Sequence, residues 1–195
     1  MSKIHKCGTV ALLGEPNAGK SSLINALVGC QVAITAPVAG TTRDAIRGIL
    51  NTEQAQIIFI DTPGMQKATN LLEQKMNRMI SGAVKTADVI CFVLDVNRIS
   101  NKTLTKLANY EDFGVPVIVV ISKTDSTTPA KLFQVLDQLK DYSFVKEFIP
   151  ISAHKNIGLK TLIECLEKYL PVGVAIYDDT MYTDSSERTM ATEII

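Results

Sequence analysis

One short motif near the start of the chain constrains its fold more than any other feature. Residues 14–21 read Gly-Glu-Pro-Asn-Ala-Gly-Lys-Ser, which matches the pattern Gly-x-x-x-x-Gly-Lys-Ser/Thr. The apolar run Gly8–Leu13 before it is typical of a buried strand, and Lys20–Val28 after it has helical spacing. Such a loop directs backbone N–H groups and the positive end of a helix at phosphate oxygens. The sequence therefore predicts a nucleotide-binding phosphate loop.

The residues of this loop have distinct expected roles. Lys20 has the chemistry to reach the terminal phosphates, and the Ser21 hydroxyl has the chemistry to ligate Mg²⁺. A plain glycine-rich turn with a serine cap on the helix is the alternative, and the strand before the motif and the helix after it disfavour that alternative. We expect nucleotide contacts from Glu15, Pro16, Asn17, Ala18, Gly19, Lys20, Ser21 and Ser22.

Two further segments are predicted to complete the phosphate and metal site. Residues 61–64, Asp-Thr-Pro-Gly, follow the apolar run Ile57–Ile60, so Asp61 would lie near Mg²⁺ and the Gly64 N–H near a γ-phosphate. Residues 41–44, Thr-Thr-Arg-Asp, lie in a stretch rich in Pro, Gly and Thr, where the Thr42 hydroxyl is the expected Mg²⁺ ligand in the triphosphate state. An Asp-capped turn and a solvated polar loop are the alternatives.

Two strand-end segments predict which base is bound. Residues 122–125, Ser-Lys-Thr-Asp, follow the Val- and Ile-rich run Val115–Ile121. The Asp125 carboxylate can accept a pair of hydrogen bonds that guanine offers and adenine does not, and the Lys123 stem can lie along the base. Residues 151–153, Ile-Ser-Ala, end the next strand, where a backbone N–H can reach the guanine carbonyl. The expected base contacts are Ser122, Lys123, Asp125, Ser152, Ala153 and His154, although a surface loop position also fits His154.

The chain alternates between strand-like and helix-like segments, which predicts parallel strands joined by right-handed crossovers. Residues 46–51 and 56–60 flank a short polar turn and predict a single hairpin, hence one antiparallel strand. We expect an α/β domain of three layers around a six-stranded, mostly parallel sheet. Strands are predicted at Gly8–Leu13, Ile46–Asn51, Gln56–Ile60, Val89–Val96, Val115–Ile121 and Phe148–Ile151, and helices at Lys20–Val28, Leu71–Lys85, Lys102–Tyr110, Ala130–Leu139 and Leu159–Leu170.

Charge and hydropathy narrow the function further. Among 195 residues, 20 basic and 20 acidic side chains cancel, which argues against a chain whose overall field captures nucleic acid. From Pro171 onward one arginine faces five acids, so this tail carries −4 and residues 1–170 carry +4. No apolar run approaches the ~20 residues that span a bilayer, and no signal-type apolar region precedes Gly14. We therefore expect neither a transmembrane segment nor export.

The cysteines point to the same compartment. Cys7, Cys30, Cys91 and Cys165 lie far apart and form no Cys-x-x-Cys pair. Such spacing favours buried free thiols over a disulfide set or a zinc site. The prediction is a cytoplasmic protein.

Taken together, these motifs resemble the translation-factor-like bacterial GTPases and, within them, the Era family of ribosome-assembly GTPases. The Pro16-Asn17 form of the phosphate loop is shared with the sister families Der and MnmE. The tail is a more specific feature, because it is similar to the Era segment that joins a G domain to an RNA-binding KH domain. The resemblance covers essentially the whole chain and rests on residues 14–22, 41–43 and 61–64, on Lys123, Asp125, Ser152 and Ala153, and on residues 170–171, 183–184 and 187–195.

The resemblance implies a P-loop NTPase fold, the G domain, over residues 1–170, and an acidic linker over residues 171–195 that leads toward an absent C-terminal KH domain. It implies a slow GTP-hydrolysing molecular switch with GTP or GDP and Mg²⁺ as cofactors. The implied partners are small-subunit ribosomal RNA and the pre-ribosomal particle. Peripheral association with the inner membrane face is a further expectation of the resemblance.

Two positions matter for the chemistry that the resemblance implies. The family's base motif is Asn-Lys-x-Asp, but Ser122 replaces the Asn; losing at least one hydrogen bond lowers affinity, while Asp125 preserves guanine preference. Met65 follows Gly64 where Ras-like enzymes carry a water-orienting Gln. Related members use K⁺ held partly by the phosphate-loop Asn, which is Asn17 here, although a loop-stabilising amide is the alternative. The expected catalytic residues are Lys20, Asn17, Thr42 and Gly64.

Other functions fit part of the pattern. A P-loop nucleoside or nucleotide kinase would need a lid with several arginines, and the five arginines of this chain are scattered. A non-hydrolysing guanine-nucleotide-binding module would keep every binding residue, and the absent Gln favours it. The G domain of a Der or MnmE protein would share the phosphate loop.

Overall fold

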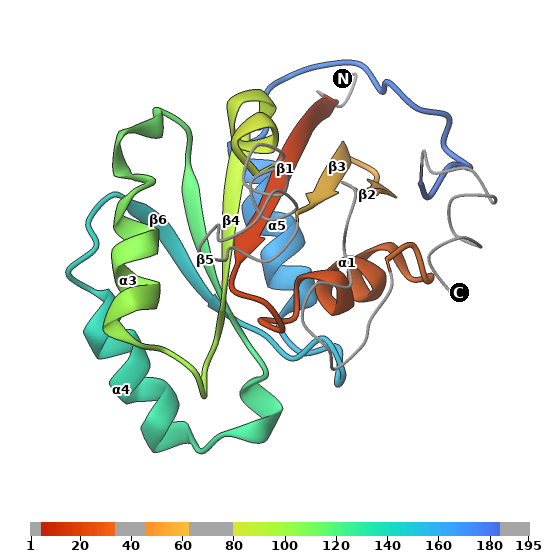
Figure 1. Ribbon diagram of the computed structural model, residues 1–195. Helices are drawn as coiled ribbons and strands as arrows, with labels where there is room; N and C mark the ends of the chain where they lie inside the picture. The colour runs from red at the N-terminus through yellow and green to blue at the C-terminus, as the bar shows by residue number, and fades with distance from the viewer. Residues whose placement is uncertain (1–4, 34–45, 63–79, 184–195) are drawn as a thin grey trace, which may run out of the picture.

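The computed structural model describes residues 5–33, 46–62 and 80–183, and a six-stranded sheet forms its centre (Figure 1). In space the strands follow the order β2-β3-β1-β4-β5-β6. β2 pairs antiparallel with β3, and every other neighbouring pair is parallel. The predicted mostly parallel sheet with one antiparallel strand is confirmed. The strands are β1 (Lys6–Gly14), β2 (Ile46–Asn51), β3 (Ala55–Asp61), β4 (Val89–Asp95), β5 (Val117–Ser122) and β6 (Val145–Pro150).

Helices cover both faces of the sheet, as the three-layer prediction requires (Figure 1). α1 (Lys20–Val28) and α5 (Leu159–Tyr169) pack on one face. α3 (Asn101–Ala108), α4 (Pro129–Leu139) and the helical residues 80–86 pack on the other. The predicted helix Leu71–Lys85 lies partly outside the described residues, and its described end is helical.

The central strands are buried on both faces. All residues of β3, β4 and β5 are buried, which explains why these segments are continuous apolar runs without polar alternation. Leu23 of α1 and Leu162 of α5 fill the core on one face, and Leu107 of α3 and Leu139 of α4 fill it on the other. The sheet therefore has an apolar core on each face, and these two cores fix the positions of the strand ends.

The parallel strands bring their carboxyl ends to one edge of the sheet. β1 ends at Gly14, β3 at Asp61, β4 at Asp95 and β5 at Ser122. In open α/β sheets ligands bind outside this edge. The described parts of the sequence motifs, which follow β1, β3, β5 and β6, therefore meet at this edge.

Residues 171–183 form a segment without a helix that passes the N-terminus and continues along the side of the molecule where β2 and β3 lie (Figure 1). Cys7 N donates to Pro171 O at 3.1 Å, and Ile49 N donates to Tyr182 O at 2.9 Å. The buried Gln56 amide lies between these two contacts, and its Oε1 accepts from Ile176 N at 2.7 Å. The described part of the predicted linker is thus attached to β1, β2 and β3, and its remainder lies outside the described residues.

The cysteines are free thiols, but one expectation about them is wrong. Cys7 and Cys91 are buried and Cys165 is partly buried, whereas Cys30 is exposed. Cys30 follows Gly29, whose left-handed backbone ends α1 and turns the chain away from the core. Among the helices that the structure describes, none combines the length and hydrophobicity needed to cross a bilayer.

Candidate functional site

The phosphate loop connects β1 to α1 through three residues with positive φ, namely Gly14, Asn17 and Gly19. A side chain at Gly14 would collide with the carbonyl oxygen of Val93 on the neighbouring strand, so the strand can end there only with glycine. Gly19, with φ 97°, caps the N-terminus of α1. Asn17 has φ 61°, a conformation that asparagine tolerates better than most residues. The sequence pattern therefore produces the curled loop that was predicted.

Lys20 lies in the first turn of α1, with its side chain folded over the loop. Its Nζ donates to the carbonyl oxygens of Gly14 at 3.3 Å and Glu15 at 3.1 Å. The residue is only 6% exposed. Burial lowers the pKa of Lys20 more than the nearby carboxylates of Asp61 and Glu15 raise it. A buried ammonium of this kind favours an anion beside it, which suits the expected phosphate contact.

Ser21 and Asp61 come together from α1 and the end of β3. The Ser21 Oγ donates to Asp61 Oδ2 at 2.6 Å, and Asp61 is buried. A hydroxyl and a carboxylate are hard oxygen donors of the kind that Mg²⁺ prefers. The two residues predicted as metal ligands on separate segments therefore fit Mg²⁺ together.

Thr62, the second residue of the Asp-Thr-Pro-Gly motif, connects β3 to β1. Its buried Oγ1 donates to Leu12 O of β1 at 2.6 Å. Leu12 is also the register partner of Asp61. The hydroxyl thus extends the pairing of β1 and β3 by one contact and fixes the direction in which Asp61 leaves the sheet.

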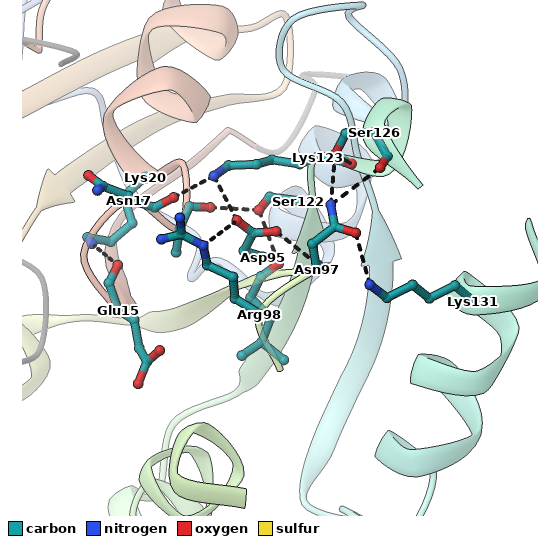
Figure 2. Close-up of polar contacts among 12 residues, drawn as sticks. Glu15, Asn17, Lys20, Asp95, Asn97, Arg98, Ser122, Lys123, Ser126 and Lys131 are labelled. Carbon is teal, nitrogen blue, oxygen red and sulfur yellow. Dashed lines mark hydrogen bonds and ion pairs between the residues drawn. The ribbon is translucent and has the colours of Figure 1, made fainter. Parts of the chain in front are cut away.

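The base segment, residues 122–125 at the end of β5, lies against the phosphate loop (Figure 2). The Ser122 Oγ donates to Ala18 O at 2.6 Å and lies 3.1 Å from Leu94 O. Lys123, with a left-handed φ of 60°, extends its Nζ to within 2.7 Å of Asn17 O. Two consecutive residues after the apolar part of β5 therefore contact two consecutive carbonyls of the phosphate loop.

Asp125 of the base segment contacts Ser152, which lies just after β6. The Ser152 Oγ donates to Asp125 Oδ1 at 2.6 Å and accepts from Lys155 N at 3.1 Å. The Ser152 hydroxyl is the main reason that the pKa of Asp125 lies below its ordinary range. Asp125 is exposed and Ser152 is buried, so the carboxylate is held ionised and directed outward from the sheet edge.

The remaining predicted residues differ in placement. The Glu15 carboxylate forms an ion pair with Lys106 of α3 at 3.0 Å. The Glu15 backbone carbonyl accepts a hydrogen bond from Lys20 Nζ. Pro16 and Ala153 are partly buried beside the same edge, whereas Ser22 and His154 are exposed. His154 is exposed as Asp125 is, so its contact with the base stays a prediction. Thr42 and Gly64 lie outside the described residues.

Two features of this site were missed from the sequence. Asp95, at the end of β4, has a buried carboxylate whose Oδ2 lies 2.7 Å from Lys123 Nζ. Ser152 was expected to act through the backbone of its segment, but its hydroxyl contacts Asp125. The sequence did contain a signal for Asp95. It directly follows the apolar run Val89–Leu94, just as Asp61 directly follows the apolar run Ile57–Ile60.

Residues 9–123 match the model of a family described as 50S ribosome-binding GTPase. GTPase Era from Lactobacillus delbrueckii subsp. bulgaricus is 36% identical over 191 residues, covering 98% of this chain and 64% of the relative. GTPase Era from Aquifex aeolicus is 39% identical over 199 residues, covering 97% of this chain and 65% of the relative.

Solved structures give the same result. A crystal structure of Era in complex with MgGDPNP and nucleotides 1506–1542 of 16S ribosomal RNA superposes with a TM-score of 0.90 at 38% identity. The match covers 97% of this chain and 65% of that one. The chain spans 64% of the length of the first curated relative that it matches. By the family model, the fold and these homologues, the chain belongs to the 50S ribosome-binding GTPase family and is homologous to the Era GTPases.

Proposed function

We propose that this chain binds GTP and GDP with Mg²⁺ and hydrolyses GTP slowly as a molecular switch. The observation that carries the proposal is the convergence of Lys20, Ser21 and Asp61 at one end of the sheet edge with Asp125 and Ser152 at the other. The first group suits phosphates and a divalent cation, and the second suits guanine. The names of the homologous GTPases support the same assignment.

Each residue has a defined part in this proposal. Lys20 exchanges its carbonyl contacts for phosphate oxygens and neutralises their charge. Bound Mg²⁺, held by Ser21 and Asp61, would neutralise further phosphate charge. Asp125 accepts from the guanine N–H groups because Ser152 keeps it ionised and oriented. Thr42 as a further metal ligand and the Gly64 N–H as a γ-phosphate donor remain predictions from the sequence.

Slow hydrolysis follows from the residue after Gly64. Met65 cannot orient a water molecule as the Gln of Ras-like enzymes does. We propose that K⁺, held partly by Asn17, assists in place of a second cationic side chain. The positive φ of Asn17 and the contact of Lys123 with its carbonyl support a fixed loop at this position.

The proposed cellular role is small-subunit ribosome assembly. The support is the homology to Era, one structure of which contains a segment of 16S ribosomal RNA. Ribosomal RNA and the pre-ribosomal particle are accordingly the proposed partners of the whole protein. Residues 1–170 are the proposed G domain and residues 171–195 the proposed linker toward a KH domain. A cytoplasmic location follows from this role, and association with the inner membrane face stays a prediction from the resemblance.

A phosphate-release assay with GTP in Mg²⁺ tests the proposed activity, with Lys20→Met as the inactive reference. We expect slow release by the wild type, faster in K⁺ than in Na⁺, and none by the variant. Equal rates in the two salts would refute the role of K⁺ and Asn17. GDP binding without phosphate release would instead support the non-hydrolysing guanine-nucleotide-binding module, which keeps every binding residue described above.

A further inference from the structure

Asp95 connects two loops that bind different parts of a nucleotide. It ends β4 and is the register partner of Ser122 on β5, so its side chain lies beside the first residues of the base segment. Its Oδ2 lies 2.7 Å from Lys123 Nζ, and the same Nζ lies 2.7 Å from Asn17 O in the phosphate loop. Figure 2 shows Lys123 extending from the base segment toward both residues. The ammonium therefore joins β4, the base segment and the phosphate loop.

The Asp95 carboxylate is fixed in one orientation. Its Oδ1 accepts from Asn97 N at 2.9 Å, a local turn contact that leaves Oδ2 directed at Lys123. The Asp95 side chain is 6% exposed and the Lys123 side chain 40% exposed. A carboxylate buried to this degree needs a cationic partner. Arg98 lies farther away, at 4.0 Å, and its side chain is 65% exposed, so Lys123 is the main partner.

The replacement at position 122 increases the importance of this pair. A serine hydroxyl has one hydrogen to donate, and Ser122 Oγ already has two carbonyl acceptors, Ala18 O and Leu94 O. Position 122 therefore holds the phosphate loop through a single shared hydrogen. The contact of Lys123 with Asn17 is the second attachment of the base segment to that loop, and Asp95 determines where its ammonium lies.

We infer that Asp95 is a positioning residue for nucleotide binding, which holds Lys123 against the phosphate loop and so keeps the phosphate and base sites in register. The inference rests on the proposed function, because it presumes that these loops bind one guanine nucleotide. In this inference Asp95 acts through Lys123 and has no contact of its own with base or phosphate. Its loss should therefore raise KM for GTP while leaving kcat nearly unchanged.

The test uses Asp95→Asn, which keeps the acceptor for Asn97 N and removes the charge. Asp137→Asn is the matched control, since Asp137 forms an equally short 2.7 Å pair with Lys140 on the exposed surface of α4. Calorimetric titration and the release of a fluorescent GDP analogue are measured in Mg²⁺ for both, for Lys123→Met and for the double variant. We expect Asp95→Asn to bind GDP about tenfold more weakly through faster release, and Asp137→Asn to match the wild type.

The double variant separates positioning from a general structural role. If Asp95 acts through Lys123, adding Asp95→Asn to Lys123→Met causes no further loss of GDP affinity. The double variant should also melt at a higher temperature than Lys123→Met, in which a buried carboxylate has lost its main partner, and this comparison holds even if Asp95→Asn alone folds poorly. A further tenfold loss, a lower melting temperature, or GDP affinity of Asp95→Asn within twofold of the wild type would overturn the inference. Failure of the wild type to bind GDP would overturn the proposed function as well.

Discussion

The hydroxyl of Ser122 donates a hydrogen bond to the carbonyl oxygen of Ala18 at 2.6 Å, joining the base segment to the phosphate loop. In the related base motif an asparagine amide occupies this position. Ser122 is 3% exposed, so the contact is shielded from water. The substitution thus preserves the connection between loops, but its single hydrogen is used by backbone carbonyls.

Restoring the amide should strengthen nucleotide binding. Ser122→Asn offers two donors instead of one, so it can hold Ala18 O and still reach the base. We expect GDP to bind about tenfold more tightly to this variant, and more weakly to Ser122→Ala, as measured by calorimetric titration. If Ser122→Asn binds GDP no more tightly than the wild type, then the serine at position 122 does not weaken nucleotide binding.

Lys20 should have opposite effects on stability and binding. Because burial lowers its pKa in the folded state, keeping this side chain protonated costs folding free energy, and the cost fades as pH rises from the folded pKa toward the ordinary one. Lys20→Met should therefore leave the nucleotide-free protein at least as stable while weakening GDP binding by roughly a hundredfold or more.

Thermal unfolding without nucleotide and titration with GDP check the two halves of this prediction. Lys160→Met is the control, because Lys160 on α5 has a side chain that is 91% exposed. A large loss of stability in Lys20→Met alone would mean that its contacts with Gly14 O and Glu15 O outweigh the cost of burying the charge.

The acid limit of GDP binding should depend on Ser152. The lowered pKa of Asp125 keeps its carboxylate ionised as pH falls, and binding is lost only below that lowered pKa. Ser152→Ala removes the main cause, so the loss of affinity should begin at a higher pH, closer to the ordinary Asp value of about 4. Titrations across acidic pH detect the shift, and Ser143→Ala on an exposed turn is the control. Superimposable pH profiles would exclude the role of the Ser152 hydroxyl.

Gln56 should control attachment of residues 171–183. The buried side-chain amide of Gln56 accepts hydrogen bonds from Ile176 N and Tyr177 N and donates one to Tyr177 O. It thus satisfies backbone groups of this segment in the way that the backbone of a neighbouring strand does. Gln56→Leu should lower the free energy of unfolding by about 2 kcal/mol and speed amide exchange at positions 176 and 177. Hydrogen–deuterium exchange measures this, with the exposed Gln138→Leu on α4 as control. Unchanged exchange in Gln56→Leu would mean that other contacts hold the segment.

The fold and the loop that positions Lys20 and Ser21 were predictable because both depend on local patterns. Apolar runs without alternation gave β4 and β5, and the loop motif determined where Lys20 and Ser21 lie. β6 begins at Val145, three residues before the predicted Phe148. It is an edge strand in which only Val145 and Ile149 are buried, and Lys146 and Glu147 interrupt the apolar pattern between them.

The contacts between loops were harder to predict because they depend on strand register. Asp95 lies opposite Ser122 only because β4 and β5 pair in one register, and no local pattern gives that register. The Ser152–Asp125 contact likewise joins segments that follow different strands. Sequence motifs identified the segments, and the sheet determined which side chains meet.

Binding of guanine nucleotides in preference to adenine nucleotides is the central claim, because the phosphate site alone would fit either. Calorimetric titration of the wild-type chain with GDP, GTP and ATP in Mg²⁺ tests it directly. We predict saturable binding of GDP and GTP and at least about a hundredfold weaker binding of ATP, since Asp125 has no matching donors on adenine. Equal or tighter binding of ATP would contradict the assignment of Asp125 and, with it, the proposed function.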